Sequence, residues 1–257
     1  MTRLLILPLI WLCAPGFAGV TASDDALSLY RAGDFVRAEQ VAVTASDPVS
    51  RTLAAQAILA QLMSGNLAER PADERRELAR RAQSHAQYAL DMDPDYAPAH
   101  LRLAAAYGYE GRYVAPLRAF MMRLPQRGRD HIERAITLDP DNPWGHAMLG
   151  AWHFEVVRRA GEGRLDSDLD IAFARYRAAV AMEGVEPAIP YHFALALVAK
   201  DPVAHRDEID ALLAQVAAHP SEAAFDQTAK GLGASLSALL DADPVAAQLE
   251  AVARLEA

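Results

Sequence analysis

Two stretches of the chain, APAHLRLAAAYGYEG at residues 97–111 and PWGHAMLGAWHFEVV at residues 143–157, share one pattern at a distance of 46 residues. The equivalent pairs are His100 and His146, Leu103 and Leu149, Ala104 and Gly150, Tyr107 and His153, Ala89 and Ala135, and Pro94 and Pro140. A fixed period of this size is typical of stacked helical hairpins. The repeat therefore predicts a protein that works by presenting a surface.

Composition agrees with a globular helical protein. Of the 257 residues 52% are apolar, so the chain can bury a core. Alanine, leucine, arginine and glutamate dominate, strand-like alternation is absent, and glycine and proline fall at intervals that end helices. The net charge of −9 argues against nucleic-acid binding, which needs a basic surface.

The first residues are typical of a secretory signal. Leu4–Leu12 is almost entirely apolar and is followed by small residues, so we expect a signal peptide over residues 1–22, cleaved after Ala18 or Ala22. Cys13, the only cysteine, lies inside it, and the mature protein would have no disulfide. The alternative is an uncleaved N-terminal membrane anchor. We expect a periplasmic or secreted bacterial protein.

The spacing of small and large residues in these units resembles the tetratricopeptide repeat (TPR). In the clearest unit the matching positions are Ala97, Leu103, Ala104, Tyr107, Gly111, Ala135 and Pro140. The resemblance covers roughly residues 24–218. It implies an all-α fold, an α-solenoid of four to five antiparallel helix hairpins. The domains would be the repeats at 23–218 and C-terminal capping helices at 219–257, near 221–241 and 244–256.

The period departs from the TPR length. It exceeds the 34 residues of that repeat by 12. The extra residues fall between the two helices of a hairpin, near Asn66–Glu77, Arg112–Gln126 and Arg158–Ser167. Insertions at equivalent positions map to one face of a solenoid, often the binding face. The alternative is that both helices of each hairpin are longer.

The run Met148–Val156 has a second resemblance. It is similar to the leucine-glycine-aromatic run in the repeat domain of the regulator of microtubule dynamics family. No function is carried over from it, because microtubule binding does not suit an exported bacterial protein.

The TPR resemblance also implies which residues line the concave groove. The candidates are Tyr30, Arg31, Leu101, Tyr109, Trp144, Phe154 and Glu155. Their aromatic members would form a strip of anchors for a protein or peptide partner, since aromatic side chains dominate interface energetics. The alternative is that longer helices close the groove and bury these rings.

A second candidate surface is the arginine-rich stretch from Arg112 to Arg134. Its anion-binding candidates are Arg112, Arg118, Arg123, Arg127 and Arg129. Guanidinium groups suit carboxylates and phosphates, so the stretch could hold an acidic peptide tail or an anionic envelope polymer. Phe120, Met121 and Met122 give it an apolar centre. The alternative is a solvated helix face.

No motif predicts catalysis, a cofactor or a metal. His146 and His153 are two helical turns apart, at positions that pack in a repeat. Asp168 and its acidic neighbours are expected to cap the helix that starts near Ile171. The leading hypothesis is an exported scaffold or adaptor for a protein or peptide partner. The alternatives are a periplasmic binding component for an anionic small molecule or glycan, and an enzyme whose site joins distant residues.

Overall fold

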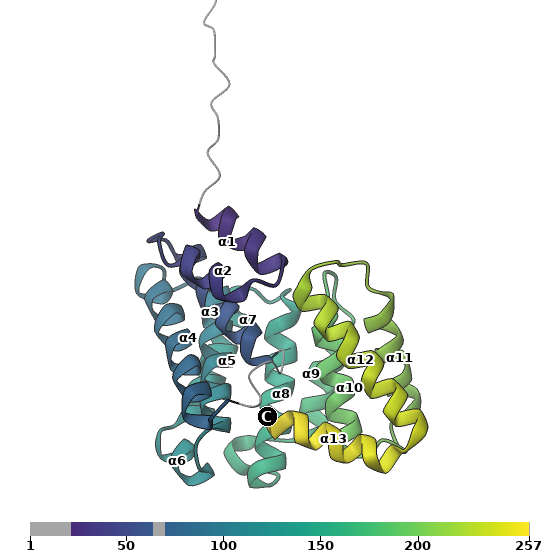
Figure 1. Cartoon of the computed structure of the whole chain (residues 1–257). Coiled ribbons are helices and arrows are strands. Elements are labelled where there is room, and N and C mark those ends of the chain that lie inside the picture. Colours follow the sequence, from purple (N-terminus) through teal and green to yellow (C-terminus); the bar gives the residue numbers. More distant parts are fainter. Residues whose placement is uncertain (1–21, 64–69, 257) are drawn as a thin grey trace, which may run out of the picture.

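The structure, a computed structural model, describes residues 22–63 and 70–256, and this part is helical with no strand. The helices are α1 (Ala22–Arg31), α2 (Phe35–Ala42), α3 (Pro48–Met63), α4 (Ala72–Met92), α5 (Ala97–Arg112), α6 (Pro116–Met121), α7 (Leu124–Leu138), α8 (Pro143–Ala160), η1 (Arg164–Asp166), α9 (Leu169–Val180), α10 (Ala188–Lys200), α11 (Arg206–Ala218), α12 (Ala224–Ala242) and α13 (Pro244–Glu256). They pair as hairpins α1–α2, α3–α4, α5–α7, α8–α9, α10–α11 and α12–α13 (Figure 1). The predicted all-α solenoid is confirmed. The predicted signal peptide lies outside the described residues except for Ala22.

Polar side chains start several of these helices. Asp34 accepts a hydrogen bond from the Arg37 backbone N–H before α2 (3.2 Å), and Asn142 accepts one from that of Trp144 at the start of α8 (3.1 Å). Asp168 accepts one from the Ile171 N–H (2.9 Å). Such caps satisfy the free N–H groups of a first helical turn, and the cap predicted at Asp168 is confirmed.

Close helix crossings explain the small residues of the repeat. A Cβ atom at Gly150 of α8 would lie 2.8 Å from the Ala172 carbonyl oxygen and 2.9 Å from the Tyr176 ring on α9. A methyl group does not fit at these distances, so α8 and α9 approach as closely as they do because residue 150 has no side chain. This is the role that the repeat pattern predicts for the position.

The 46-residue period also repeats a hydrogen bond. His100 Nε2 lies 2.9 Å from the Pro94 carbonyl oxygen, and His146 Nε2 lies 2.9 Å from that of Pro140. In each unit the imidazole donates from Nε2, which leaves Nδ1 free to accept. For His100 the group facing Nδ1 is His131 Nδ1, at 2.8 Å. These histidines therefore hold the start of each first helix to the preceding loop.

Two glutamates connect neighbouring hairpins. Glu110 of α5 is 2% exposed and accepts hydrogen bonds from Arg76 (2.9 Å) and Gln83 (2.8 Å) on α4. Glu39 of α2 accepts two from Arg81 on α4, at 2.7 and 2.9 Å. A buried carboxylate needs such partners because it has lost its water. The pairs therefore set how the first three hairpins stack.

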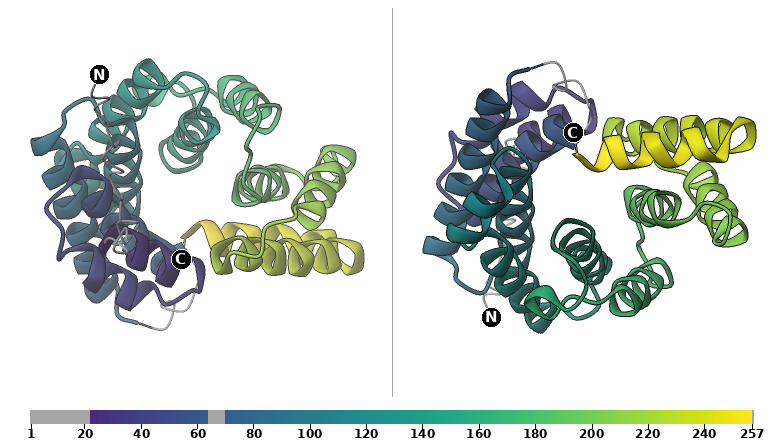
Figure 2. Two further views of the ribbon diagram at one scale, coloured as in Figure 1. Left: turned by 90° about the horizontal axis from the view of Figure 1, so that it is seen from above. Right: turned by 90° about the horizontal axis from the view of Figure 1, so that it is seen from below.

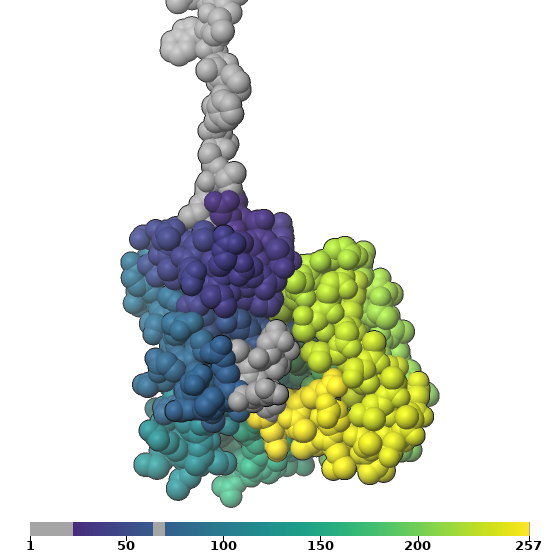
Figure 3. All heavy atoms as spheres, viewed as in Figure 1, coloured from purple at the N-terminus to yellow at the C-terminus, as the bar shows by residue number. Residues whose placement is uncertain are grey.

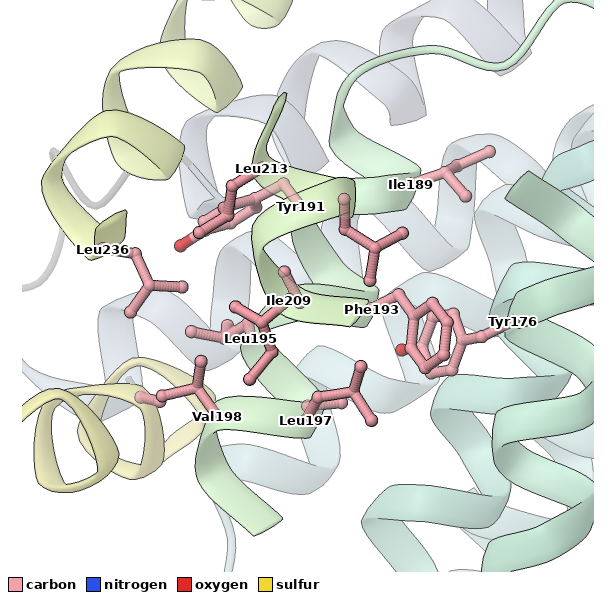
Figure 4. Close-up of a cluster of buried hydrophobic side chains, with 14 of the residues drawn as sticks. Tyr176, Ile189, Tyr191, Phe193, Leu195, Leu197, Val198, Ile209, Leu213 and Leu236 are labelled. Carbon is pink, nitrogen blue, oxygen red and sulfur yellow. The ribbon is translucent and has the colours of Figure 1, made fainter. Parts of the chain in front are cut away.

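The C-terminal half is organised around α10. This helix is apolar on all sides, with the sequence AIPYHFALALVAK, because α8, α9, α11, α12 and α13 all pack against it. Its Phe193 ring stacks on Tyr176 of α9, with centroids 4.9 Å apart (Figure 4). On the other side Leu195 and Val198 lie in the same buried cluster as Leu236 of α12.

The extra residues of the period do two things. In the third unit they form the short helix α6 between α5 and α7, and in the fourth they form η1 after α8. Several helices are also long, with 21 residues in α4 and 18 in α8. Both expectations for the insertions therefore hold in part. Of the insertion near Asn66–Glu77, residues 66–69 lie outside the described part of the chain.

The solenoid closes on itself. Seen along its axis, the helices run round a ring until α12 reaches α1 (Figure 2). The Tyr30 and Phe225 rings lie 6.3 Å apart there, and a Cβ atom at Gly33 would lie 2.9 Å from that of Ala224. On the side of the molecule seen in Figure 3, α12 and α13 form one end. The C-terminal helices thus pack on α10 and α11, as expected of caps, and also join the two ends of the stack.

Within residues 22–63 and 70–256, no helix combines the length and apolarity needed to cross a bilayer.

Candidate functional site

The inner side of the ring contains a pocket of about 750 Å³. Its walls come mainly from the first helices of successive hairpins, α1, α3, α5, α8 and α10, and α12 adds Phe225 beside Tyr30 of α1. This size lies in the range of small-ligand sites, about 300–1,000 Å³. The closure of the ring therefore converts the open groove of a solenoid into a pocket.

Aromatic rings form much of the wall. Trp144 at the start of α8 and Tyr109 near the end of α5 both line the pocket, with Tyr30 and Phe225 at the ring closure. The Trp144 indole Nε1 donates a hydrogen bond to Glu186 (3.2 Å), which holds the ring at the wall. Burial raises the pKa of the Tyr30 phenol to about 12, so it is neutral at physiological pH.

Two arginines of α5 bring positive charge to the pocket. Arg102 donates two hydrogen bonds to the Gln56 side-chain carbonyl, at 3.1 and 3.3 Å, and the Arg112 guanidinium lies 4.7 Å from the centre of the Tyr109 ring. Neither guanidinium forms an ion pair with a carboxylate in the described part of the chain. Their charges act on two carboxylates of the same wall, since Arg112 lowers the pKa of Glu155 and Arg102 opposes the rise in that of Glu186.

Two glutamates of the wall behave differently. Burial raises the pKa of Glu155, but Arg112, Arg158 and other nearby cations outweigh it and hold that pKa below its usual range. Solvent in the pocket reaches the Glu186 carboxylate, yet burial among the surrounding helices raises its pKa, with Arg102 opposing the rise. The Glu155 carboxylate is thus held in its charged form, whereas Glu186 takes up a proton more readily than an ordinary glutamate.

The pocket extends between α5 and α8 toward the inserted segments. At this end the lining residues include Phe120 of α6, Leu124 of α7, Leu165 of η1 and Trp152 of α8. The Trp152 indole Nε1 donates to the Pro125 carbonyl oxygen (2.8 Å), which fixes the ring. Two insertions of the long repeat therefore contribute directly to the pocket.

The structure places the seven groove candidates in three groups. Those that line the pocket are Tyr30, Tyr109, Trp144 and Glu155. Leu101 and Phe154 instead are core residues, 2% and 4% exposed, because their faces of α5 and α8 turn toward neighbouring helices. The Phe154 ring lies 6.3 Å from that of Phe173 on α9. Arg31 is exposed and does not line the pocket.

The five arginine candidates do not form one cluster. Arg112 faces the pocket, whereas Arg127 donates to the Tyr107 hydroxyl and Arg129 to Glu133 (2.7 Å). These last two also lie over aromatic rings, at 4.2 Å from Tyr107 and 5.1 Å from Trp152. Arg118 and Arg123 are exposed on or beside α6.

Other lining residues were not predicted. Arg102 comes one position after Leu101 and therefore lies about 100° further round α5, on a face that the TPR resemblance did not assign to the groove. Phe225 belongs to a helix expected only to cap the stack, and no local signal shows that it faces α1. His192 of α10 also lines the pocket, where burial lowers its pKa to about 4 and its Nε2 lies 3.4 Å from Met63 Sδ.

Histidine and acidic side chains have structural roles at the positions considered above. His153 is 4% exposed, and its Nδ1 accepts a hydrogen bond from the Asp168 backbone N–H (3.3 Å). His146 Nδ1 lies 3.3 Å from Arg175. Among the described residues, no group of three histidine, cysteine or acidic side chains is placed to bind a metal ion.

The hairpins, their close crossings and the inner pocket define a helical-repeat protein of the TPR type. The crystal structure of a thermophilic TPR protein of Thermus thermophilus is similar, with a TM-score of 0.60 and 19% sequence identity over 83% of this chain and 96% of that chain. At this identity the likeness establishes the fold alone. No curated protein matches the sequence.

The chain belongs to the family described as Regulator of microtubule dynamics protein 1-3. The profile of that family matches residues 25–160, from α1 to the end of α8. The match therefore extends far beyond the run Met148–Val156. Of the two helices that meet where the ring closes, α1 lies mostly within the matched residues and α12 lies outside them.

Proposed function

We propose that this protein is a non-enzymatic, exported scaffold that binds a partner protein of the cell envelope and takes a short segment of that partner into the pocket. The TPR-like fold suggests a protein-interaction scaffold. The observation that carries the proposal is the aromatic wall of Tyr109 and Trp144 on the inner side of the ring. A pocket of about 750 Å³ accepts a few residues of a chain and excludes a folded domain.

Two further points support the proposal. None of the described residues lining the pocket is a serine, threonine or cysteine, so the usual hydroxyl and thiol nucleophiles are missing from that lining. Export rests on the sequence of residues 1–22 alone, with its apolar run and small residues before the expected cleavage sites.

The test is an affinity pull-down of the tagged full chain from an envelope extract, comparing Trp144→Ala with Trp144→Phe and Tyr88→Ala. Tyr88 is an exposed aromatic residue on α4 that does not line the pocket. We expect a reproducible partner that is lost with Trp144→Ala, largely retained with Trp144→Phe and unaffected by Tyr88→Ala. Circular dichroism would establish that each variant keeps its helices. A partner that binds Trp144→Ala normally would contradict the pocket as its site.

A second candidate function is the binding of an anionic small molecule or glycan. It is favoured by Arg102 and Arg112, which line the pocket and form no direct ion pair in the described part of the chain, although their charges also act on Glu186 and Glu155. Native mass spectrometry of the purified protein tests it. A bound mass that disappears in Arg102→Gln/Arg112→Gln would favour this function, and a pocket that purifies empty while a protein partner is captured would favour the scaffold.

A further inference from the structure

Helix α6 carries an exposed apolar patch. Leu117, Phe120 and Met121 are 71%, 55% and 75% exposed, although residues of this size usually lie in the core. We call these three residues the α6 patch. They lie within five positions of one short helix at an edge of the molecule (Figure 1). Contiguous exposed apolar side chains of this kind mark interaction sites.

The surroundings of the α6 patch are positively charged. Arg118 lies within it and Arg123 directly after α6, and neither forms an ion pair with a carboxylate in the described part of the chain. The sequence has no acidic residue between Glu110 and Asp130. In a chain with a net charge of −9, this stretch is therefore a local region of positive charge. Its charge favours a negatively charged partner.

The form of the patch separates the candidate partners. A second copy of the chain would place the same arginines against each other, and three side chains cannot provide the roughly 800 Å² that a partner buries in a stable complex. The high exposure of Leu117 and Met121 shows that they project into solvent and do not line a groove for a peptide. Projecting apolar side chains beside unpaired cations suit the interface of an anionic bilayer, where apolar groups enter the acyl region and guanidinium groups contact lipid phosphates.

We propose that α6 is a membrane-docking element, in which Leu117, Phe120 and Met121 insert into the interface of an anionic bilayer while Arg118 and Arg123 bind lipid phosphates. Phe120 also lines the pocket, so docking places that end of the pocket against the lipid surface. The proposal does not depend on the partner-binding function, although the two surfaces share Phe120, because it concerns the contact of α6 with lipid and is tested without a protein partner.

The experiment uses the full chain with an environment-sensitive dye at one position. Because Cys13 is the only cysteine, Met121→Cys in a Cys13→Ser background can be labelled at that site alone. The matched control is Leu249→Cys on α13, which is 68% exposed. A dye at either position reports its own surroundings, however the N-terminal residues behave. Both proteins are titrated with vesicles of phosphatidylglycerol and phosphatidylcholine, and with vesicles of phosphatidylcholine alone.

We expect the dye at residue 121 to brighten and shift to the blue with the anionic vesicles only, while the dye at residue 249 stays unchanged. In the labelled Arg118→Gln/Arg123→Gln variant the partition coefficient should fall roughly 25-fold, about fivefold for each arginine. An unchanged dye at residue 121 overturns the proposal. So does an equal response at residue 249, or equal binding to both kinds of vesicle. Melting curves of the labelled proteins exclude unfolding as the cause of any change.

Discussion

The crossing of α8 and α9 makes a quantitative prediction for Gly150→Ala. The new Cβ atom would lie 2.8 Å from the Ala172 carbonyl oxygen and 2.9 Å from the Tyr176 ring. The ring cannot retreat, because it is 3% exposed and stacks on Phe193 with an interplanar angle of 4°. The helices must therefore separate. Overpacking of this kind costs about 1–3 kcal/mol.

Alanine also favours the helix itself. In the middle of a helix it is better than glycine by about 1 kcal/mol, so the net loss of folding free energy for Gly150→Ala is about 0–2 kcal/mol. Gly231 of α12 provides the control, since a Cβ atom there meets nothing within 4 Å. Gly231→Ala should therefore stabilise the fold by about 1 kcal/mol. The free energies of unfolding of the two variants should therefore differ by about 1–3 kcal/mol, with Gly231→Ala the more stable, although the chemical change is the same.

The assay is urea unfolding followed by circular dichroism, with thermal melting as a second measure. For a chain of this size each kcal/mol corresponds to roughly 2–4 °C in Tm. Gly150→Leu should fail to form the stack, because three further carbons must occupy the same space. If Gly150→Ala stabilised the protein as much as Gly231→Ala, the crossing would be looser than described and the reasoning would be refuted.

Three further predictions concern the buried charges and the ring closure. Glu110→Gln leaves Arg76 without its charged partner and should cost about 2–3 kcal/mol in urea unfolding. This is somewhat less than the cost of about 3–5 kcal/mol for a fully buried pair, because Arg76 is partly exposed; a loss below about 0.5 kcal/mol would contradict this. Burial and the neighbouring His100 lower the pKa of His131 to about 4, so the unfolded chain binds a proton there more readily than the folded one. The free energy of unfolding should therefore fall by up to about 1.4 kcal/mol per pH unit as the pH drops from 6.5 to 4. His131→Asn should remove that part of the slope, and an unchanged slope would show that His131 is not its source. Phe225→Ala should loosen the contact between α12 and α1, seen as faster collisional quenching of tryptophan emission by acrylamide; quenching equal to that of the wild type would mean that the ring stays closed without this side chain.

The sequence predicts the local features of this fold well. The period of 46 residues, the small residue at Gly150 and the cap at Asp168 all report contacts within one hairpin. Such contacts depend on residues a few positions apart or on the adjoining helix, so they leave a pattern in the sequence. The family relation was visible in the run Met148–Val156, but only the profile match to residues 25–160 shows its extent.

The pocket could be predicted only in part, because it depends on how small rotations add up along the stack. The groove positions inferred by resemblance assume one rotation for every first helix. The inferred positions are right for Tyr109 and Trp144 but wrong for Leu101 and Phe154. These two lie on the same helices, α5 and α8, but on faces that are buried against neighbouring helices. The contribution of Phe225 follows from the curvature of the complete ring, which no single repeat encodes.

The contact between Tyr30 and Phe225 also limits how this protein can change in length. An open solenoid tolerates a duplicated hairpin, because each unit touches only its neighbours. Here an additional hairpin would move α12 away from α1, open the ring and widen the pocket at once. Duplications and deletions of single hairpins should therefore be rare among proteins that share this closure. Loss of α1 or of α12 should weaken the opposite end of the stack as well as its own.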